Sequence, residues 1–392
     1  MSLICMEEEF NSFFKGLIKG YYSSALNIFP RHMESREFGF GDFQSKIKYR
    51  HYAFKTKDAL RTYLVENAPP FVSCSAAEYR YPDARPIETK GFVGAELVFD
   101  LDVNDLKLNC TPAHPSSWVC DNCLENVKDE TIRLIEDFLV PDFGFQKDKI
   151  SINFSGNRGY HVHVNDSRSF LLGGEARREI STYISGFGID PSAFFPTINM
   201  AGHRLEGPRP SDGGWGGKLA RRVVEALNEG EEAVVRMGIE PALARRLIKN
   251  KAEVMFGIAS GNWDKIRIPR KGEFWTKVFA GLAIKGGDNI DRNVTNDISH
   301  LLRLPNSIHG DTGLIAKEVE LARLPSFDPR KDCVAFKQGE LKVKTGNVQK
   351  FEIGGIPYGP YLEREVVVLP MAAAVYLVRK GFAVQALPQT QK

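Results

Sequence analysis

The stretch "GAELVFDLDVND" at residues 94–105 combines the pattern of a buried strand with acidic residues. Successive side chains of an extended chain point to opposite faces, so Asp100 and Asp102 are expected side by side, with Leu101 on the other face. Two like charges near an apolar core are unfavourable unless a cation compensates them. A hard divalent cation would do so, and an edge strand with one solvated face is the alternative.

The overall composition is that of a folded protein with a sizeable core, at 392 residues, 43% hydrophobic and 26% charged. A net charge of +3 means that any nucleic acid would have to be bound by a local basic patch. The N-terminus is acidic and lacks the apolar run of a signal peptide, and the apolar run at 366–378 is too short to span a bilayer. We therefore expect a cytosolic protein with no membrane contact.

Helical and extended patterns alternate along the chain. Helical spacing covers 8–26 and 127–143, strands are expected at 149–154 and 161–164, and a last helix is expected at about 370–381. This order predicts an α/β (α+β) core. We expect that core to comprise 1–210 and 256–392, with a helical insertion at 211–255 that follows a stretch rich in glycine and proline.

A loop expected at 105–126 carries four potential metal ligands with the spacing C-x3-H-x5-C-x2-C. They are Cys110, His114, Cys120 and Cys123. Thiolates and one imidazole suit tetrahedral Zn²⁺, and four protein ligands are typical of a closed, structural site. Free surface cysteines are the alternative.

The stretch "INFSGNRGYHVHV" at 152–164 predicts two strands joined by a tight turn. Gly156 and Gly159 would let backbone amides approach an anion, while Arg158 and His161 offer donors and positive charge to phosphate oxygens. A simple hairpin is one alternative. A second is a phosphoesterase metal site, because His161 and His163 are expected on the same face.

The segment 289–314 offers a third carboxylate, for which Asp291 and Asp297 both qualify. Asp297 could instead cap a helix at 298–304, and the pattern chooses poorly between the two acids. A Pro-Asn turn here could bind a polyphosphate, and it is flanked by Arg303, Ser307 and His309.

Together these motifs resemble the catalytic small subunit of the archaeal and eukaryotic type of DNA primase. The resemblance begins at "SREFGFGDF" (35–43), continues through the three motifs in the same order, and ends at "FDP" (327–329). It implies a primase-type catalytic core with an RNA-recognition-like sheet, a zinc-binding knuckle and a helical insertion.

The resemblance also implies roles for individual residues. Asp100 and Asp102 match the metal-binding pair, and Asp291 matches the third catalytic carboxylate, which together would hold Mg²⁺ or Mn²⁺. The positions that match nucleotide contacts are Ser155, Gly156, Arg158, His161, Arg303 and His309, with Arg50 as a basic residue near the site. Asn157 departs from the family pattern, because many relatives have a second arginine there.

The function implied is the synthesis of short RNA primers on single-stranded DNA by two-metal-ion nucleotidyl transfer. The partners implied are a primase large subunit, a single-stranded DNA template and NTPs, with dNTPs left open, in a cytoplasmic, nucleoid-associated setting. Two alternatives are a metal-dependent phosphoesterase or nuclease and a non-catalytic zinc-bearing nucleic-acid-binding protein.

Overall fold

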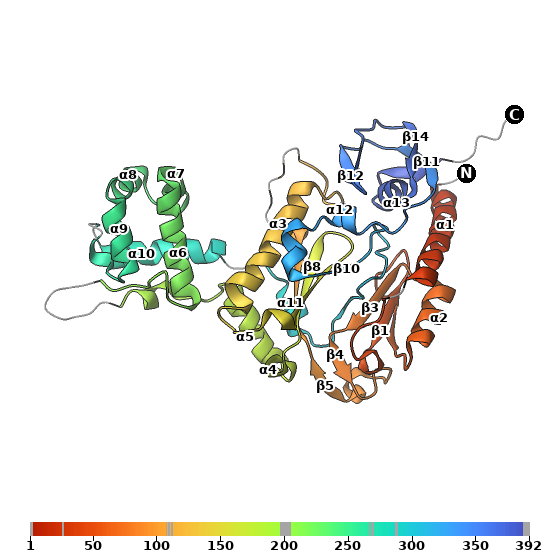
Figure 1. Cartoon of the computed structure of the whole chain (residues 1–392), viewed down its shortest axis with the longest axis horizontal. Helices are drawn as coiled ribbons and strands as arrows, with labels where there is room; N and C mark the ends of the chain where they lie inside the picture. Colours follow the sequence, from red (N-terminus) through yellow and green to blue (C-terminus); the bar gives the residue numbers. More distant parts are fainter. Residues whose placement is uncertain are drawn as a thin grey trace. The chain divides into compact units, whose positions relative to one another are not determined.

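The computed structural model describes residues 3–25, 27–106, 108, 110, 113–196, 205–265, 268, 270–286 and 289–386. The chain forms two compact units. The first comprises Met1–Ile132, Gln146–Arg178 and Ile290–Lys392, and the second comprises Arg133–Phe145 and Glu179–Asn289. Helices and strands alternate in the first unit, which confirms the predicted mixed α/β class (Figure 1). None of the helices in the described ranges is long and apolar enough to cross a membrane.

The first sheet of unit 1 is antiparallel and has the order β2-β1-β3-β9. Its strands are β1 (Phe38–Gly41), β2 (Tyr49–Tyr52), β3 (Phe71–Ser75) and β9 (Leu301–Arg303). Helices α1 (Leu3–Ser24) and α2 (Lys57–Asn67) contribute Phe14 and Leu60 to an apolar core that also contains Phe38 of β1. Burial of these side chains fixes the sheet against the two helices.

The helix predicted at 298–304 is wrong, because this segment contains β9. Leu301 and Leu302 pair with β3 and are buried, so sheet pairing outweighs the local helical pattern. The Asp297 carboxylate caps no helix here and accepts a hydrogen bond from the backbone N–H of Ser299 at 2.9 Å.

The second sheet carries the acidic motif and has the order β10-β7-β8-β6, again antiparallel. Its strands are β6 (Leu97–Asp102), β7 (Ile150–Phe154), β8 (Gly159–Val164) and β10 (Lys317–Val319). Leu97, Phe99 and Leu101 are fully buried, while Asp100 and Asp102 are partly exposed on the other face. The predicted alternation of side chains along this strand is therefore confirmed, and β6 lies at the sheet edge.

Unit 1 contains further helices and strands. They are β4 (Ala77–Tyr79), β5 (Phe92–Ala95), α3 (Asp121–Arg133), α4 (Ser167–Phe170), α11 (Arg292–Asn296), α12 (Pro329–Asp332), β11 (Glu340–Thr345), β12 (Phe351–Ile353), β13 (Ile356–Tyr358), β14 (Val366–Pro370) and β15 (Ala383–Gln385). Helix α13 (Met371–Arg379) packs on the sheet β14-β11-β15 (Figure 1), which confirms the helix predicted near the C-terminus.

The second unit is mainly helical. Its helices are α6 (Gly214–Glu229), α7 (Glu231–Arg236), α8 (Pro241–Lys249), α9 (Lys251–Ala259) and α10 (Lys271–Gly286), together with the end of α5 (Gly174–Ile184) and a π-helical segment at Leu134–Leu139. Trp263 and Trp275 are fully buried and meet edge to face, with ring centroids 4.7 Å apart. The helical insertion predicted at 211–255 falls within this unit, and its status as a separate subdomain stays a prediction.

Candidate active site and metal-binding loop

Asp100 and Asp102 lie on the edge strand β6, and the backbone of Asp291 lies beside that edge. The register with β8 sets Asp100 opposite His161 and Asp102 opposite Gly159. The backbone N–H of Asp291 donates a hydrogen bond to the carbonyl oxygen of Asp100 at 2.9 Å. Since β6 is an edge strand, its outer backbone groups are open to such a bond. Tertiary structure thus brings the backbone of Asp291 to the strand that carries Asp100 and Asp102. The Asp291 carboxylate accepts a hydrogen bond from the backbone N–H of Asn293 at 2.8 Å.

The electrostatics of this acidic cluster fit a divalent cation. Burial raises the pKa of Asp100 to about 7, and the negative charges of Asp102, Asp291 and Asp105 contribute to the rise. Burial and the charges of Asp102 and Asp291 also raise the pKa of Asp105. Carboxylates that repel one another are ligands that Mg²⁺ and Mn²⁺ favour, because a cation removes the repulsion.

The turn that follows β7 lies beside this acidic cluster. The guanidinium Nε of Arg158 is 2.8 Å from a carboxylate oxygen of Asp102. The hydroxyl of Ser155 accepts hydrogen bonds from the backbone N–H groups of Asn157 and Gly159, at 3.4 and 3.2 Å. These bonds close the turn and hold Arg158 against the acids.

Gly156 meets two constraints in this turn. Its φ is +86°, a conformation that residues with a side chain rarely adopt, and an added Cβ would lie 2.7 Å from the Cβ of His309. We expect Gly156→Ala to lower the free energy of unfolding by about 1–3 kcal/mol, measured by urea denaturation. Gly173→Ala is the matched control, because a Cβ added at Gly173 would have nothing within 4 Å. Equal stability of the two variants would contradict a strained turn.

Two buried residues come from β9 and the segment that follows it: Arg303 is the last residue of the strand, and His309 lies against Gly156 of the turn. Arg303 donates a hydrogen bond to the carbonyl oxygen of Val72 at 3.2 Å and lies over the ring of Phe71, 4.8 Å from its centroid. His309 contacts that ring edge-on, at 5.3 Å between centroids. Burial, with the positive charges of Arg303, Lys46, Lys380 and Arg158, lowers the pKa of His309 well below its usual value. His309 is therefore neutral and surrounded by cations, as a site for a polyanion requires.

His161 is also neutral. Burial lowers its pKa to about 3, and the neighbouring charges of His163, Arg303 and His300 contribute. Its Nε2 lies 3.6 Å from a carboxylate oxygen of Asp100. The neutral ring can donate one hydrogen bond but contributes no positive charge. His163 instead pairs with Glu96, Nδ1 to Oε2 at 2.8 Å. The two imidazoles thus face different carboxylates, which does not favour the phosphoesterase alternative.

Arg50 lies on β2 and is held by a carboxylate. It donates to both oxygens of Glu37, at 2.9 and 3.2 Å, and to the carbonyl oxygen of Ser299 at 3.1 Å. The last bond ties β2 to the segment that leads into β9. A nucleotide contact by Arg50 stays a prediction.

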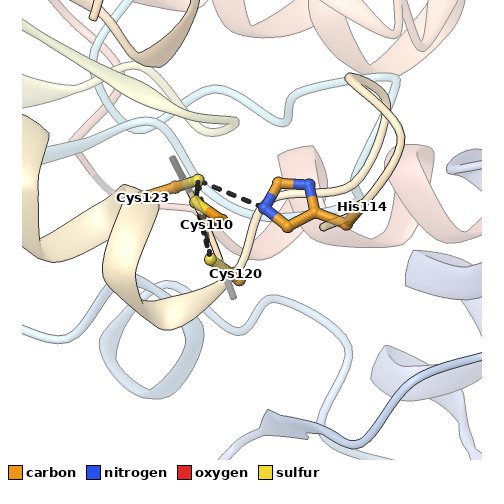
Figure 2. Close-up of side chains that lie close together, drawn as sticks. All are labelled: Cys110, His114, Cys120 and Cys123. Atoms are coloured by element: carbon orange, nitrogen blue, oxygen red, sulfur yellow. Dashed lines mark hydrogen bonds between the residues drawn. The ribbon is translucent and has the colours of Figure 1, made fainter. Parts of the chain in front are cut away.

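The four predicted metal ligands come together, three from the segment between β6 and α3 and Cys123 from the first turn of α3. Their ligand atoms all lie within 4.8 Å of one another. The three Sγ atoms are 3.4–3.6 Å apart, and His114 Nε2 is 3.5 Å from Cys123 Sγ (Figure 2). A tetrahedral zinc with Zn–S bonds of about 2.3 Å requires sulfurs about 3.8 Å apart, so the arrangement fits one ion after a small expansion. The predicted clustering is confirmed.

Neighbouring groups orient the ligands and anchor the loop. His114 Nδ1 is 3.0 Å from the carbonyl oxygen of Pro115, which leaves Nε2 free to bind a metal. Asn122 donates to Cys110 Sγ at 3.6 Å. Trp118 is buried and meets the ring of Phe382 edge-on at 4.9 Å, so the loop is packed on the C-terminal segment.

Three charged residues of the site were not found from the sequence. Asp105 belongs to the acidic cluster. The positive charge of Lys46 lowers the pKa of both Asp100 and His309, and the charge of Lys380 lowers the pKa of His309. Lys46 comes from the β1–β2 connection and Lys380 from the end of α13. Neither lysine stands in a pattern that distinguishes it from a solvent-exposed lysine, so no sequence signal could have found them.

A cluster of carboxylates beside a group of cationic side chains is typical of proteins that handle nucleotides or other phosphates with metal ions. Residues 99–321 match the family model described as "DNA primase small subunit". The chain is 34% identical to the DNA primase small subunit PriS of Methanothrix thermoacetophila, over 96% of this chain and 99% of that protein. It is also 34% identical to the PriS protein of Thermoplasma acidophilum, over 94% and 98%. The chain belongs to the DNA primase small subunit family.

Proposed function

We propose that this chain is the catalytic subunit of a DNA primase, which synthesises short RNA primers on single-stranded DNA for replication. The observation that carries the proposal is the hydrogen bond from the N–H of Asp291 to the carbonyl oxygen of Asp100. This bond supports a role for Asp291 as the third acid, because it holds the backbone of Asp291 beside the pair on β6. Family membership supports the same activity.

The residues of the acidic cluster would act as metal ligands. Asp100, Asp102 and Asp291 would hold two Mg²⁺ or Mn²⁺ ions, which when bound supply charge stabilisation to the attacking and leaving oxygens of a nucleotidyl transfer. Asp105 lies close enough to raise the negative potential there. This negative potential is what would concentrate divalent cations at the edge of β6.

The cationic groups beside the acids would bind and orient the triphosphate. Arg158 and Arg303 supply charge, and the neutral rings of His161 and His309 each supply one N–H donor. The turn at Ser155 and Gly156 would bring backbone amides near phosphate oxygens. No side chain is required as a nucleophile, because the attacking group is the hydroxyl of the growing primer.

The remaining expectations fit this role. The two four-stranded sheets would form the primase-type core, one of them RNA-recognition-like, and Zn²⁺ would have a structural role in the loop of Cys110–Cys123. A chain related to proteins called small subunits is expected to work with a large subunit. Template binding should weaken with salt, because it depends on phosphate contacts.

A template-directed synthesis assay tests the proposal. Purified chain is incubated with a primer-free single-stranded template, Mn²⁺ and labelled NTPs or dNTPs in parallel. We expect labelled oligonucleotides complementary to the template. Template degradation without incorporation would instead indicate a nuclease, and binding without either reaction would indicate a non-catalytic module.

A further inference from the structure

The end of helix α13 reaches the turn that is proposed to bind phosphate. Lys380 Nζ donates a hydrogen bond to Asn157 Oδ1 at 2.6 Å. The preceding residue, Arg379, donates to the carbonyl oxygen of Gly310 at 2.6 Å. An added Cβ at Gly313 would lie 2.6 Å from Val375 of α13, so the backbone near His309 packs directly on this helix. Lys380 is therefore positioned by helix α13, which packs on the segment near His309, and by its hydrogen bond to Asn157.

Lys380 lies among other positive charges. Burial and the charge of Arg158 lower its pKa to about 8, while the carboxylates of Asp311 and Asp102 act in the opposite sense. The positive charge of Lys380, with those of Arg158, Arg303 and Lys46, also lowers the pKa of His309. A partly buried ammonium close to a guanidinium favours the binding of an anion, and a polyphosphate could accept hydrogen bonds from both groups.

We propose that Lys380 contacts the triphosphate of the incoming nucleotide and completes the cationic wall that Arg158 and Arg303 begin. Asn157 orients its ammonium through the 2.6 Å hydrogen bond. The neutral side chain of Asn157 thus holds a lysine from the far end of the chain, at the position where the family resemblance leads one to expect an arginine. This inference rests on the proposed function and adds a substrate contact to it.

The first test is Lys380→Met. In the template-directed assay, we expect the KM for NTPs to rise about ten-fold or more, as for loss of one charge-assisted hydrogen bond, with kcat within about three-fold of wild type. The inhibition constant of inorganic tripolyphosphate should rise in parallel. Lys344→Met is the matched control, because Lys344 is an exposed lysine of the neighbouring strand β11 and should leave both values unchanged.

A charge rescue separates substrate binding from a tether between α13 and the turn. Asn157→Arg in the Lys380→Met background should restore the KM to within about three-fold of wild type. If Lys380 only tethered α13 to the turn, Asn157→Arg would give no rescue. Lys380→Met would then lower stability and kcat without a selective rise in KM. Either result would overturn the inference.

Two further outcomes keep the test decisive. Should Lys380→Met fail to fold, Asn157→Ala removes the oxygen that orients the ammonium, and an unchanged KM in that variant would overturn the inference. An inactive wild-type chain would contradict the proposed function itself. An active wild type with an unaltered KM in Lys380→Met would contradict the role of Lys380 alone.

Discussion

Asp100→Asn is expected to lower the rate of primer synthesis more than about 100-fold without loss of stability. Loss of a group that only orients a metal ligand costs about 10–100-fold, so loss of a ligand itself should cost more. In the folded state, mainly burial raises the pKa of Asp100 to about 7. Ionisation of Asp100 therefore destabilises the fold progressively as the pH rises from the pKa of the unfolded state to the pKa of the folded state. At pH 8 the neutral amide should therefore leave the free energy of unfolding equal or higher. Chemical denaturation and the template assay measure the two effects.

The matched control for this prediction is Asp58→Asn. Asp58 is an exposed acid in the first turn of α2, within the same unit. Its variant should keep wild-type activity. Activity of Asp100→Asn within a few-fold of wild type would exclude Asp100 as a metal ligand, and a large loss of stability would mean that the lost activity reports misfolding.

Removal of the metal from the Cys/His loop is expected to have the largest effect on stability. Wild-type protein should contain one zinc per chain, and Cys120→Ser should lose it together with several kcal/mol of stability, because the binding free energy of a structural zinc contributes to folding. The effect should extend to the C-terminal segment, since Trp118 of the loop packs on Phe382 and Tyr376. Elemental analysis and thermal unfolding measure both results.

Cys74→Ala controls for the zinc measurement, because Cys74 is a buried free thiol outside the loop. It should keep a full equivalent of zinc. Wild-type protein without zinc, or Cys120→Ser with an undiminished zinc content, would contradict the structural role of the metal.

Local patterns predicted the parts of the site that depend on neighbouring residues. The alternation of Leu97 to Asp102 determined which side chains share a face, and strand pairing preserved it. The spacing from Cys110 to Cys123 was enough to predict four clustered ligands, because a short loop limits how far they can separate. The tight turn between the two strands was predicted from the sequence pattern, and Gly156 in that turn has a positive φ.

Features that depend on contacts distant in sequence could not be predicted in this way. The segment 298–304 has a helical pattern, yet pairing with β3 makes it a strand. No local pattern encodes the backbone hydrogen bond that brings Asp291 beside Asp100, so the pattern alone chose poorly between Asp291 and Asp297. Lys380 reaches the site only because α13 packs on the segment around His309.

The central claim is that Asp291 joins Asp100 and Asp102 in one catalytic centre, and the activity of two isosteric variants tests it most directly. Asp291→Asn and Asp297→Asn are compared for labelled nucleotide incorporation on a primer-free single-stranded template. We predict a loss of more than about 100-fold for Asp291→Asn and near wild-type synthesis for Asp297→Asn. Full activity of Asp291→Asn, with or without a loss in Asp297→Asn, would contradict the account.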